Sequence, residues 1–115
     1  MNQEVVSRER VPRYTWGDGC DGFRLLDDDA LSVVEERMPK GTSEVRHKHE
    51  RAAQFFYVLR GALTIEIEGV EHVVGAERGM AIRPGRAHTV MNVADDDAVF
   101  LVVSSPSTRG DRVPQ

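Results

Sequence analysis

The sequence predicts an all-β fold in a single domain spanning residues 1–115, and three observations support this prediction. Ten glycines and five prolines interrupt the chain at short intervals, which leaves segments of strand length between them. Several of these segments alternate apolar and polar residues with the period of two that half-exposed strands show. The chain is also long enough to bury one hydrophobic core but too short for two.

The first expected elements are an arm and a strand. Residues 1–30 form the predicted N-terminal arm, and its polar residues 1–12 are expected to pack loosely or against a partner chain. The stretch LSVVEERM, residues 31–38, could begin a short helix. A turn-like Pro-Lys-Gly follows it, so in an all-β context we expect a strand there.

Three later segments are expected to be strands of two kinds. Residues 62–67 alternate regularly, as an antiparallel strand with one face in the core should. Residues 55–59 (FFYVL) and 98–103 (AVFLVV) are apolar on both faces, which predicts central strands covered on both sides. Residues 106–115 are polar and, like the first twelve, are expected to pack loosely or against a partner chain.

Charge and composition exclude several classes of partner. The formal net charge is −4, and the acidic clusters at 27–29 and 95–97 are typical of solvated turns. Because the chain lacks a basic stripe, no nucleic acid partner is expected. It also lacks the apolar run of a membrane span or a signal peptide, so we expect no membrane partner and a cytoplasmic location.

The single cysteine, Cys20, excludes an internal disulfide. We expect it to be a free thiol in or near a turn. Catalysis or metal ligation by this thiol is the alternative.

Two of the four histidines, His47 and His49, stand one residue apart directly before a strand-like run. On a strand, side chains two residues apart project from the same face and can share one binding partner. On a helix the two would diverge by about 200°. The spacing therefore predicts that one face of a sheet holds two imidazoles.

Two stretches of the chain resemble the motifs of the cupin superfamily. The first motif is a glycine, two histidines one residue apart, an acidic residue five positions on and a closing glycine. It is matched here by Gly41, His47, His49, Gln54 and Gly61. The second motif is matched by PGRAHTVMN, which places Gly85, His88 and Asn92 in register. The resemblance covers about residues 31–105 and departs from the family pattern at two positions, Gln54 in place of glutamate and Glu77 in place of a glycine.

Similarity to cupins implies a small β-barrel of jelly-roll type with one divalent transition metal ion inside the barrel mouth. The resemblance assigns its ligands to His47, His49, His88 and Gln54. Three imidazoles and an amide oxygen suit Mn, Fe, Ni, Cu or Zn rather than calcium. Two alternatives stay open, namely a vestigial site without metal and a Gln54 amide that hydrogen-bonds a ligated water or the substrate.

Few other side chains could do chemistry beside this site. Glu36 shares its strand face with inward-facing apolar residues and is a candidate catalytic carboxylate, although a surface pair with Arg37 is the alternative. Tyr57 is a second catalytic candidate, and metal-bound water is a third possibility. Glu50 is expected to face away from the site, and His72 to be structural or on the surface.

The alternation along the strands predicts which other residues line the pocket. They are Phe56, Val58, Arg86, Val90 and Asn92. Such a pocket would be largely apolar, as small-molecule sites usually are.

Three functions remain open on the sequence alone. The favoured function is a metal-dependent enzyme that acts on a small organic substrate, with an anionic substrate preferred. The metal would act as a Lewis acid in isomerase, cyclase or lyase chemistry. A neutral Gln54 favours it because the ion keeps its full charge. The alternatives are a metal-dependent dioxygenase and a non-catalytic module that binds a small molecule. We also expect a homodimer, in which Val5, Val6 and Val11 of the arm pair with the partner's sheet.

Overall fold

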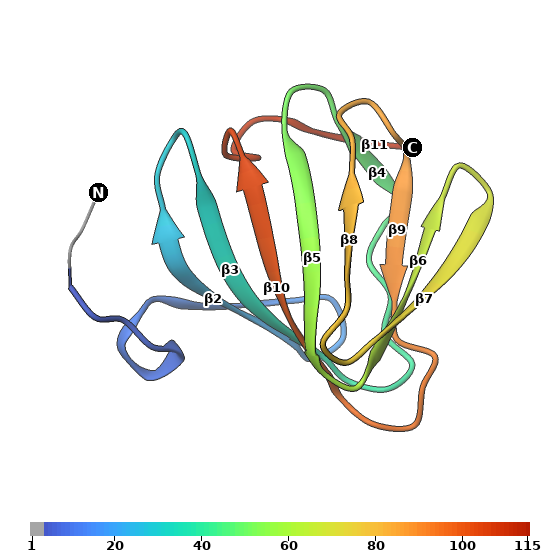
Figure 1. Ribbon diagram of the computed structural model, residues 1–115, viewed down its shortest axis with the longest axis horizontal. Coiled ribbons are helices and arrows are strands. Elements are labelled where there is room, and N and C mark those ends of the chain that lie inside the picture. Colours follow the sequence, from blue (N-terminus) through green and yellow to red (C-terminus); the bar gives the residue numbers. More distant parts are fainter. Residues whose placement is uncertain (1–3) are drawn as a thin grey trace.

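The computed structural model describes residues 4–115 and arranges them as two antiparallel β-sheets that face each other (Figure 1). The six-stranded sheet has the order β1-β2-β3-β10-β5-β8, and the five-stranded sheet the order β11-β4-β9-β6-β7. A short 3-10 helix, η1 (Arg8–Arg10), precedes the first strand. The strands are β1 (Arg13–Trp16), β2 (Cys20–Asp27), β3 (Ser32–Met38), β4 (His47–His49), β5 (Ala53–Arg60), β6 (Ala62–Ile67), β7 (Val70–Gly75), β8 (Gly79–Ile82), β9 (His88–Met91), β10 (Ala98–Ser105) and β11 (Arg112–Pro114).

The predicted all-β jelly roll is confirmed, with one difference. Within residues 4–115 the two sheets remain separate hydrogen-bonded ladders rather than one ladder closed around a barrel. The apolar faces of both sheets meet between them, where Met38, Val58, Leu63, Ile65 and Phe100 are almost fully buried. In the described part of the chain, no helix has the length and apolar character needed to cross a membrane.

The predicted strands are present, but one face of the six-stranded sheet is more exposed than predicted. Residues 32–38 form β3, as expected, and β10 lies in the middle of its sheet. β5 is also central, between β10 and β8. The prediction that both strands are covered on both sides is wrong, because Leu101 and Val103 of β10 share the outer face of β5 and are only half-buried. Phe55 and Leu59 are each 42% exposed, because no layer of the described chain covers the outer face of the sheet at β5. Further along this face, Arg8 of η1 packs on Phe23 of β2 and pairs with Glu35 of β3.

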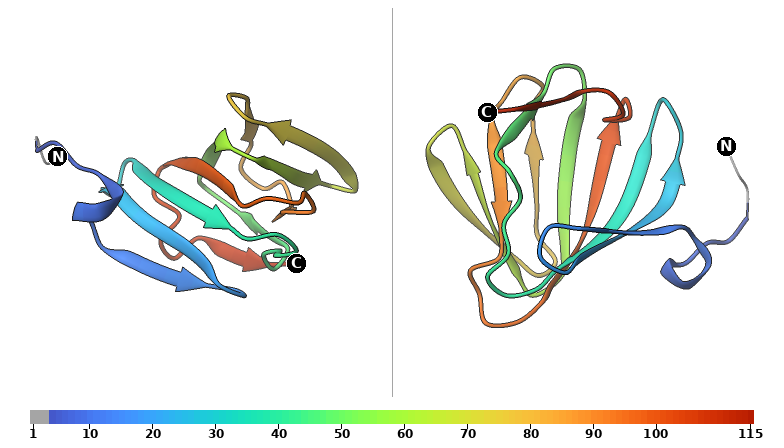
Figure 2. Two further views of the ribbon diagram at one scale, coloured as in Figure 1. Left: turned by 90° about the horizontal axis from the view of Figure 1, so that it is seen from below. Right: turned by 180° about the vertical axis from the view of Figure 1, so that it is seen from behind.

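The N-terminal arm and the C-terminal segment both contribute strands to the sheets. In the N-terminal arm, β1 and β2 form a hairpin that extends the six-stranded sheet beyond β3. At the other end, β11 pairs with β4 of its own chain, so the expectation of loose packing is wrong there. Figure 2 shows the hairpin crossing the side of the molecule on which β4 and the C-terminus lie.

Candidate metal centre

Three buried histidines converge from two neighbouring strands. His47 and His88 are direct partners in the β4–β9 ladder, and His49 lies two residues further along β4 on the same face. One ring nitrogen of each lies within 4.8 Å of the corresponding atom of the other two. Strand alternation therefore places His47 and His49 on one face, as predicted, and the pairing of β4 with β9 brings His88 beside them.

Backbone carbonyls select the same tautomer in all three rings. His47 Nδ1 lies 2.8 Å from the carbonyl oxygen of Val45, and His88 Nδ1 lies 2.9 Å from that of Arg86. His49 Nδ1 lies 3.0 Å from the carbonyl oxygen of Asp111. Because a carbonyl can only accept, these contacts favour a proton on each Nδ1 and a lone pair on each Nε2, while Arg112 Nη2 also lies 3.3 Å from His47 Nδ1. This arrangement is the one that orients histidines as metal ligands.

Two unsatisfied acceptors show that the site fits a cation. Among the described residues, His88 Nε2 and Gln54 Oε1 are buried polar atoms without a hydrogen-bond partner. The Gln54 amide nitrogen donates to Ser104 Oγ at 3.2 Å, which holds the amide with its oxygen unpaired. Buried acceptors of this kind are costly unless a donor or a cation meets them. The residues that could hold a metal are thus the three histidines, with Gln54 as a possible oxygen donor.

Burial keeps the imidazoles neutral. Loss of solvation lowers the pKa of His47 to about 4 and holds the pKa values of His49 and His88 below the usual range. The backbone hydrogen bonds oppose this shift only in part. Neutral imidazoles are the form that binds transition metals.

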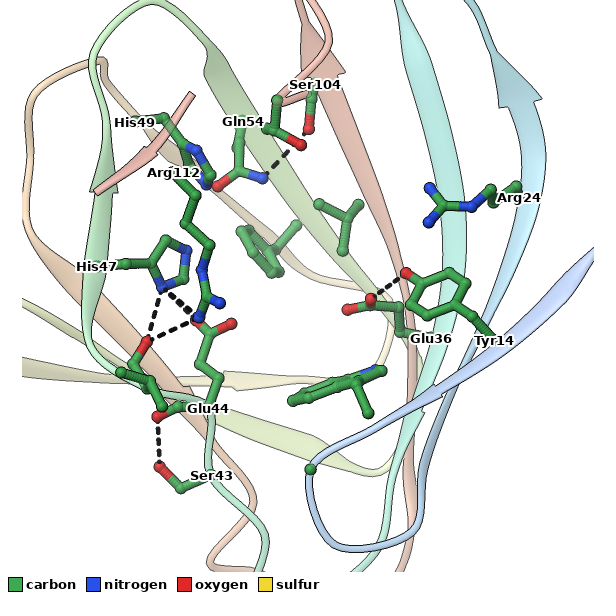
Figure 3. A pocket seen from close by; sticks show the side chains of 16 residues that line it. Tyr14, Arg24, Glu36, Ser43, Glu44, His47, His49, Gln54, Ser104 and Arg112 are labelled. Carbon is green, nitrogen blue, oxygen red and sulfur yellow. Dashed lines mark hydrogen bonds and ion pairs between the residues drawn. The ribbon is translucent and has the colours of Figure 1, made fainter. Parts of the chain in front are cut away.

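A cavity of about 530 Å³ opens between this centre and the N-terminal hairpin. Figure 3 shows His47 and Arg112 on one wall and Tyr14 and Glu36 on the other. Its lining also includes Trp16, Gln54, Phe56 and Val102, so apolar and aromatic surface surrounds a few polar groups. This is the usual character of a small-molecule site.

Glu36 lies in this cavity. Tyr14 donates a hydrogen bond of 2.6 Å to its Oε2 atom. Arg37, the partner in the alternative interpretation, instead pairs with Asp21 and Asp97. Burial raises the pKa of Glu36 to about 7, although the Tyr14 hydrogen bond and the charge of Arg24 oppose the shift. A carboxyl group with this pKa can both take up and release a proton near neutral pH.

A second carboxyl group lines the cavity, and the sequence analysis missed it. Glu44 Oε1 accepts a hydrogen bond of 3.0 Å from the Val90 N–H, and burial together with the charge of Glu36 raises its pKa to about 8. Its position in an irregular segment before β4 gave no periodic signal. Two cations of the cavity also left no clear signal in the sequence: Arg112 lies in the C-terminal segment expected to pack loosely, and Arg24 lies in the N-terminal arm, for which no strand was predicted at residues 20–27.

Tyr14 and Trp16 did leave a signal in the sequence. They alternate in RYTW and therefore share a strand face, but the arm was not interpreted as a strand. Trp16 Nε1 is a further buried atom without a hydrogen-bond partner in the described chain. The hairpin thus supplies polar groups to the cavity.

The structure separates several other candidates from the site. Tyr57 lies on the outer face of β5, stacked on Phe55, and does not line the cavity. Arg86 is exposed and pairs with Glu68. Glu50 is exposed, and His72 lies away from the three histidines on β7. Cys20 is a free, fully buried thiol at the start of β2, in the hydrophobic core.

Three residues expected to line the pocket serve the fold instead. Val58 and Val90 belong to the hydrophobic core. The Asn92 amide nitrogen donates to the carbonyl oxygens of Met38 and Asp96, both at 2.8 Å. Asn92 therefore fixes the turn that follows β9. Of the five residues expected there, Phe56 lines the cavity.

Comparison with known proteins places these features in a family. Residues 34–104 match the family described as Cupin domain. An oxidoreductase from Arthrobotrys oligospora is 32% identical in an alignment of 106 residues that covers 85% of this chain and 42% of that protein. The chain therefore spans less than half the length of this relative.

Two further similarities extend over nearly the whole chain. An oxalate-binding protein from Thermotoga maritima is 24% identical in an alignment of 109 residues that covers 90% of each protein. The solved structure of the polyketide cyclase RemF from Streptomyces resistomycificus has a TM-score of 0.81 at 22% identity, covering 92% of this chain and 81% of that one. At such identity, the structural likeness establishes the fold alone.

Proposed function

This chain belongs to the cupin family, and we propose that it is a divalent-metal-dependent enzyme acting on a small organic anion. The ligands in this proposal are His47, His49, His88 and Gln54. The chemistry is of the isomerase, cyclase or lyase type, with Glu36 as the group that moves a proton.

The observation that carries the proposal is the buried His88 Nε2 atom, which has no hydrogen-bond partner among the described residues and lies within the cluster of three histidines. The Nδ1 atom of each ring contacts a backbone carbonyl oxygen. A purely structural histidine cluster would be expected to satisfy both nitrogens of each ring. Here the unsatisfied nitrogen belongs to a group whose ligand atoms converge within 4.8 Å.

The chain's own residues define what the site can do. A divalent ion, when bound, supplies Lewis acidity that polarises an oxygen of the substrate. Arg24 and Arg112 bring positive charge to the cavity walls and so favour an anionic substrate. Glu36 takes a proton from the substrate when ionised and returns it when protonated, which its pKa of about 7 allows at neutral pH.

The names of similar proteins support a small-molecule ligand of this kind. One relative is described as oxalate-binding, and one structural neighbour is described as a polyketide cyclase. Oxalate is a small anion, and cyclisation of a polyketide involves carbon acids next to carbonyl groups. Both suit a cavity that combines cations with a proton-transferring carboxyl group.

A metal-dependent dioxygenase is the second candidate, because the relative from Arthrobotrys oligospora is described as an oxidoreductase. A non-catalytic binding module is the third. Turnover that strictly requires oxygen and a redox-active metal would favour the second candidate. Tight binding of small anions without turnover, with any of the suitable metals, would favour the third.

The first test is metal content. We expect close to one divalent transition ion per chain after purification without chelator, and a loss of at least tenfold in metal affinity in His49→Ala and His88→Ala. Elemental analysis and competition with a chromogenic chelator measure these quantities. His72→Ala is the matched control, since that histidine lies outside the cluster. Wild-type protein that stays metal-free after reconstitution would overturn the proposed function.

A further inference from the structure

Tyr14, Gly22 and Glu36 occupy one row across three neighbouring strands. Tyr14 of β1 is the register partner of Gly22 of β2, and Gly22 is the register partner of Glu36 of β3. Side chains directly opposite each other on a sheet project from the same face. Tyr14 and Glu36 therefore point into the same cavity although a whole strand separates them.

Gly22 provides the space for this contact. A Cβ atom at Gly22 would overlap the Cζ, Cε1 and Oη atoms of the Tyr14 ring. The φ angle of Gly22 lies outside the left-handed region, so the backbone does not itself require glycine there. The absence of a side chain instead lets the Tyr14 ring lie across β2, and its hydroxyl reaches Glu36 Oε2 at 2.6 Å.

Arg24 completes the arrangement. It lies two residues after Gly22, and its guanidinium carbon lies 4.4 Å from the centre of the Tyr14 ring. Figure 3 shows Arg24 beside this ring and the tyrosine hydroxyl directed at Glu36. The cation packs against the ring and adds positive charge near the carboxylate.

The groups that face Glu36 set its proton affinity. From β1 and β2 these are Tyr14 and Arg24, and from the segment before β4 the carboxyl group of Glu44. Cys20 of β2 is also close enough to interact electrostatically. On the other side, the neighbouring residue in β10 is the apolar Phe100. Burial raises the pKa of Glu36 to about 7, and the Tyr14 hydrogen bond is the largest influence that opposes this rise.

We propose that Tyr14, seated on Gly22, is a positioning residue that aims the Glu36 carboxyl group into the cavity and tunes its proton affinity. The inference rests on the proposed function, in which Glu36 transfers the proton. Under this proposal, the N-terminal hairpin contributes a residue to the site. The hairpin would then contribute to the chemistry even if it took no part in contacts between chains.

Titration of Glu36 tests this role without any substrate. The signal of the Glu36 carboxyl carbon is followed by ¹³C NMR over a range of pH. It is assigned as the signal that disappears in Glu36→Gln. In Tyr14→Phe, the ionised carboxylate loses a donor, so its pKa should rise by roughly one unit or more. Because less carboxylate is then present at a given pH, the acid limb of any pH–activity profile should move to higher pH by the same amount.

Gly22→Ala provides a second, independent variant. The added methyl group must displace the Tyr14 ring, so the Glu36 pKa should rise as it does in Tyr14→Phe. Gly75→Ala is the matched control, because a Cβ at Gly75 meets nothing within 4 Å and its φ angle lies outside the left-handed region. Tyr57→Phe is the control for loss of a hydroxyl, since Tyr57 lies outside the cavity. Both controls should leave the titration unchanged.

The outcomes separate this inference from the proposed function. The titration is made with and without Zn²⁺, and circular dichroism verifies that each variant is folded. If Gly22→Ala does not fold, the Glu36 pKa in Tyr14→Phe decides the test, because this variant keeps the aromatic ring and loses only the hydroxyl group. An unchanged Glu36 pKa in Tyr14→Phe would overturn the inference even if one metal ion is bound. A raised pKa would support it even if the wild-type chain binds no metal and the proposed function fails.

Discussion

Gln54 shows how one residue can set the character of the centre. Its amide nitrogen is anchored to Ser104 Oγ, and its oxygen has no partner among the described residues. A glutamate at this position would add a negative charge beside the three histidines. The neutral amide leaves the full charge of a bound divalent ion available to polarise an anionic substrate.

Replacing this amide with a carboxylate should separate affinity from activity. In Gln54→Glu, the Ser104 hydroxyl can donate to the new carboxylate, so the side chain keeps its anchor. We expect roughly tenfold tighter binding of divalent metal from the added charge, together with weaker activity on an anionic substrate. Chelator competition measures the first quantity and steady-state kinetics the second. Gln115→Glu is the control for charge alone, because Gln115 is exposed at the C-terminus. Unchanged activity and pH profile would show that the amide has no special role.

At the scale of elements, the C-terminal segment supports the centre from outside. The carboxylate of Asp111, just before β11, accepts hydrogen bonds from the backbone N–H groups of Glu50, Arg51 and Ala52. Its backbone carbonyl accepts the Nδ1–H of His49. Burial alone would raise the pKa of Asp111, but these donors outweigh it and hold the pKa below the usual range. One residue thus orders the loop after β4 and orients a histidine.

Asp111→Ala should therefore weaken both the fold and the metal site. The variant leaves three backbone donors without their carboxylate, so we expect the melting temperature to fall by about 5 °C or more. Metal affinity should fall by roughly tenfold, because the loop that presents the Asp111 carbonyl to His49 Nδ1 is no longer held in place by the carboxylate. Thermal unfolding and chelator competition measure the two effects. Asp95→Ala is the control, since the Asp95 side chain is 95% exposed. The contribution of Asp111 should disappear as the pH falls through its depressed native pKa.

At the scale of the whole molecule, the outer face of the six-stranded sheet remains open at β5 and β10. Phe55 and Tyr57 on β5 are register partners of Val103 and Leu101 on β10, and Leu59 continues the row. We call these five residues the β5–β10 face. Its exposed phenylalanine and leucine suit an interface better than open solvent. In the arm, through which the dimer contact was predicted, Val5 and Val6 are also exposed.

The predicted homodimer can be tested through this face. We expect light scattering at tens of micromolar to give twice the chain mass, and Leu59→Glu to reduce it to that of one chain, because the substitution places a charge in the apolar contact. Val73→Glu is the control, as Val73 is 77% exposed on the five-stranded sheet. A wild-type mass of one chain would refute the prediction.

The sequence by itself determined the features that depend on neighbouring residues. Alternating polarity and the glycine and proline spacing specified the β fold, because a strand's two faces are set by local geometry. The spacing of His47 and His49 placed both on one face for the same reason. Their convergence with His88 was expected from the family motif, and the β4–β9 ladder brings these residues together.

The tertiary structure alone decided which distant segments complete the cavity. Tyr14 meets Glu36 across 22 positions of sequence, and Asp111 meets His49 across 62. Neither pair leaves a periodic signal, because each contact depends on the order of strands in a sheet rather than on the alternation within a strand. The exposure of the outer face of β5 likewise depends on how the elements pack, not on the alternation within the strand. Apolar residues on both sides of a strand indicate that both faces avoid water, and only packing decides which layer, if any, covers each face.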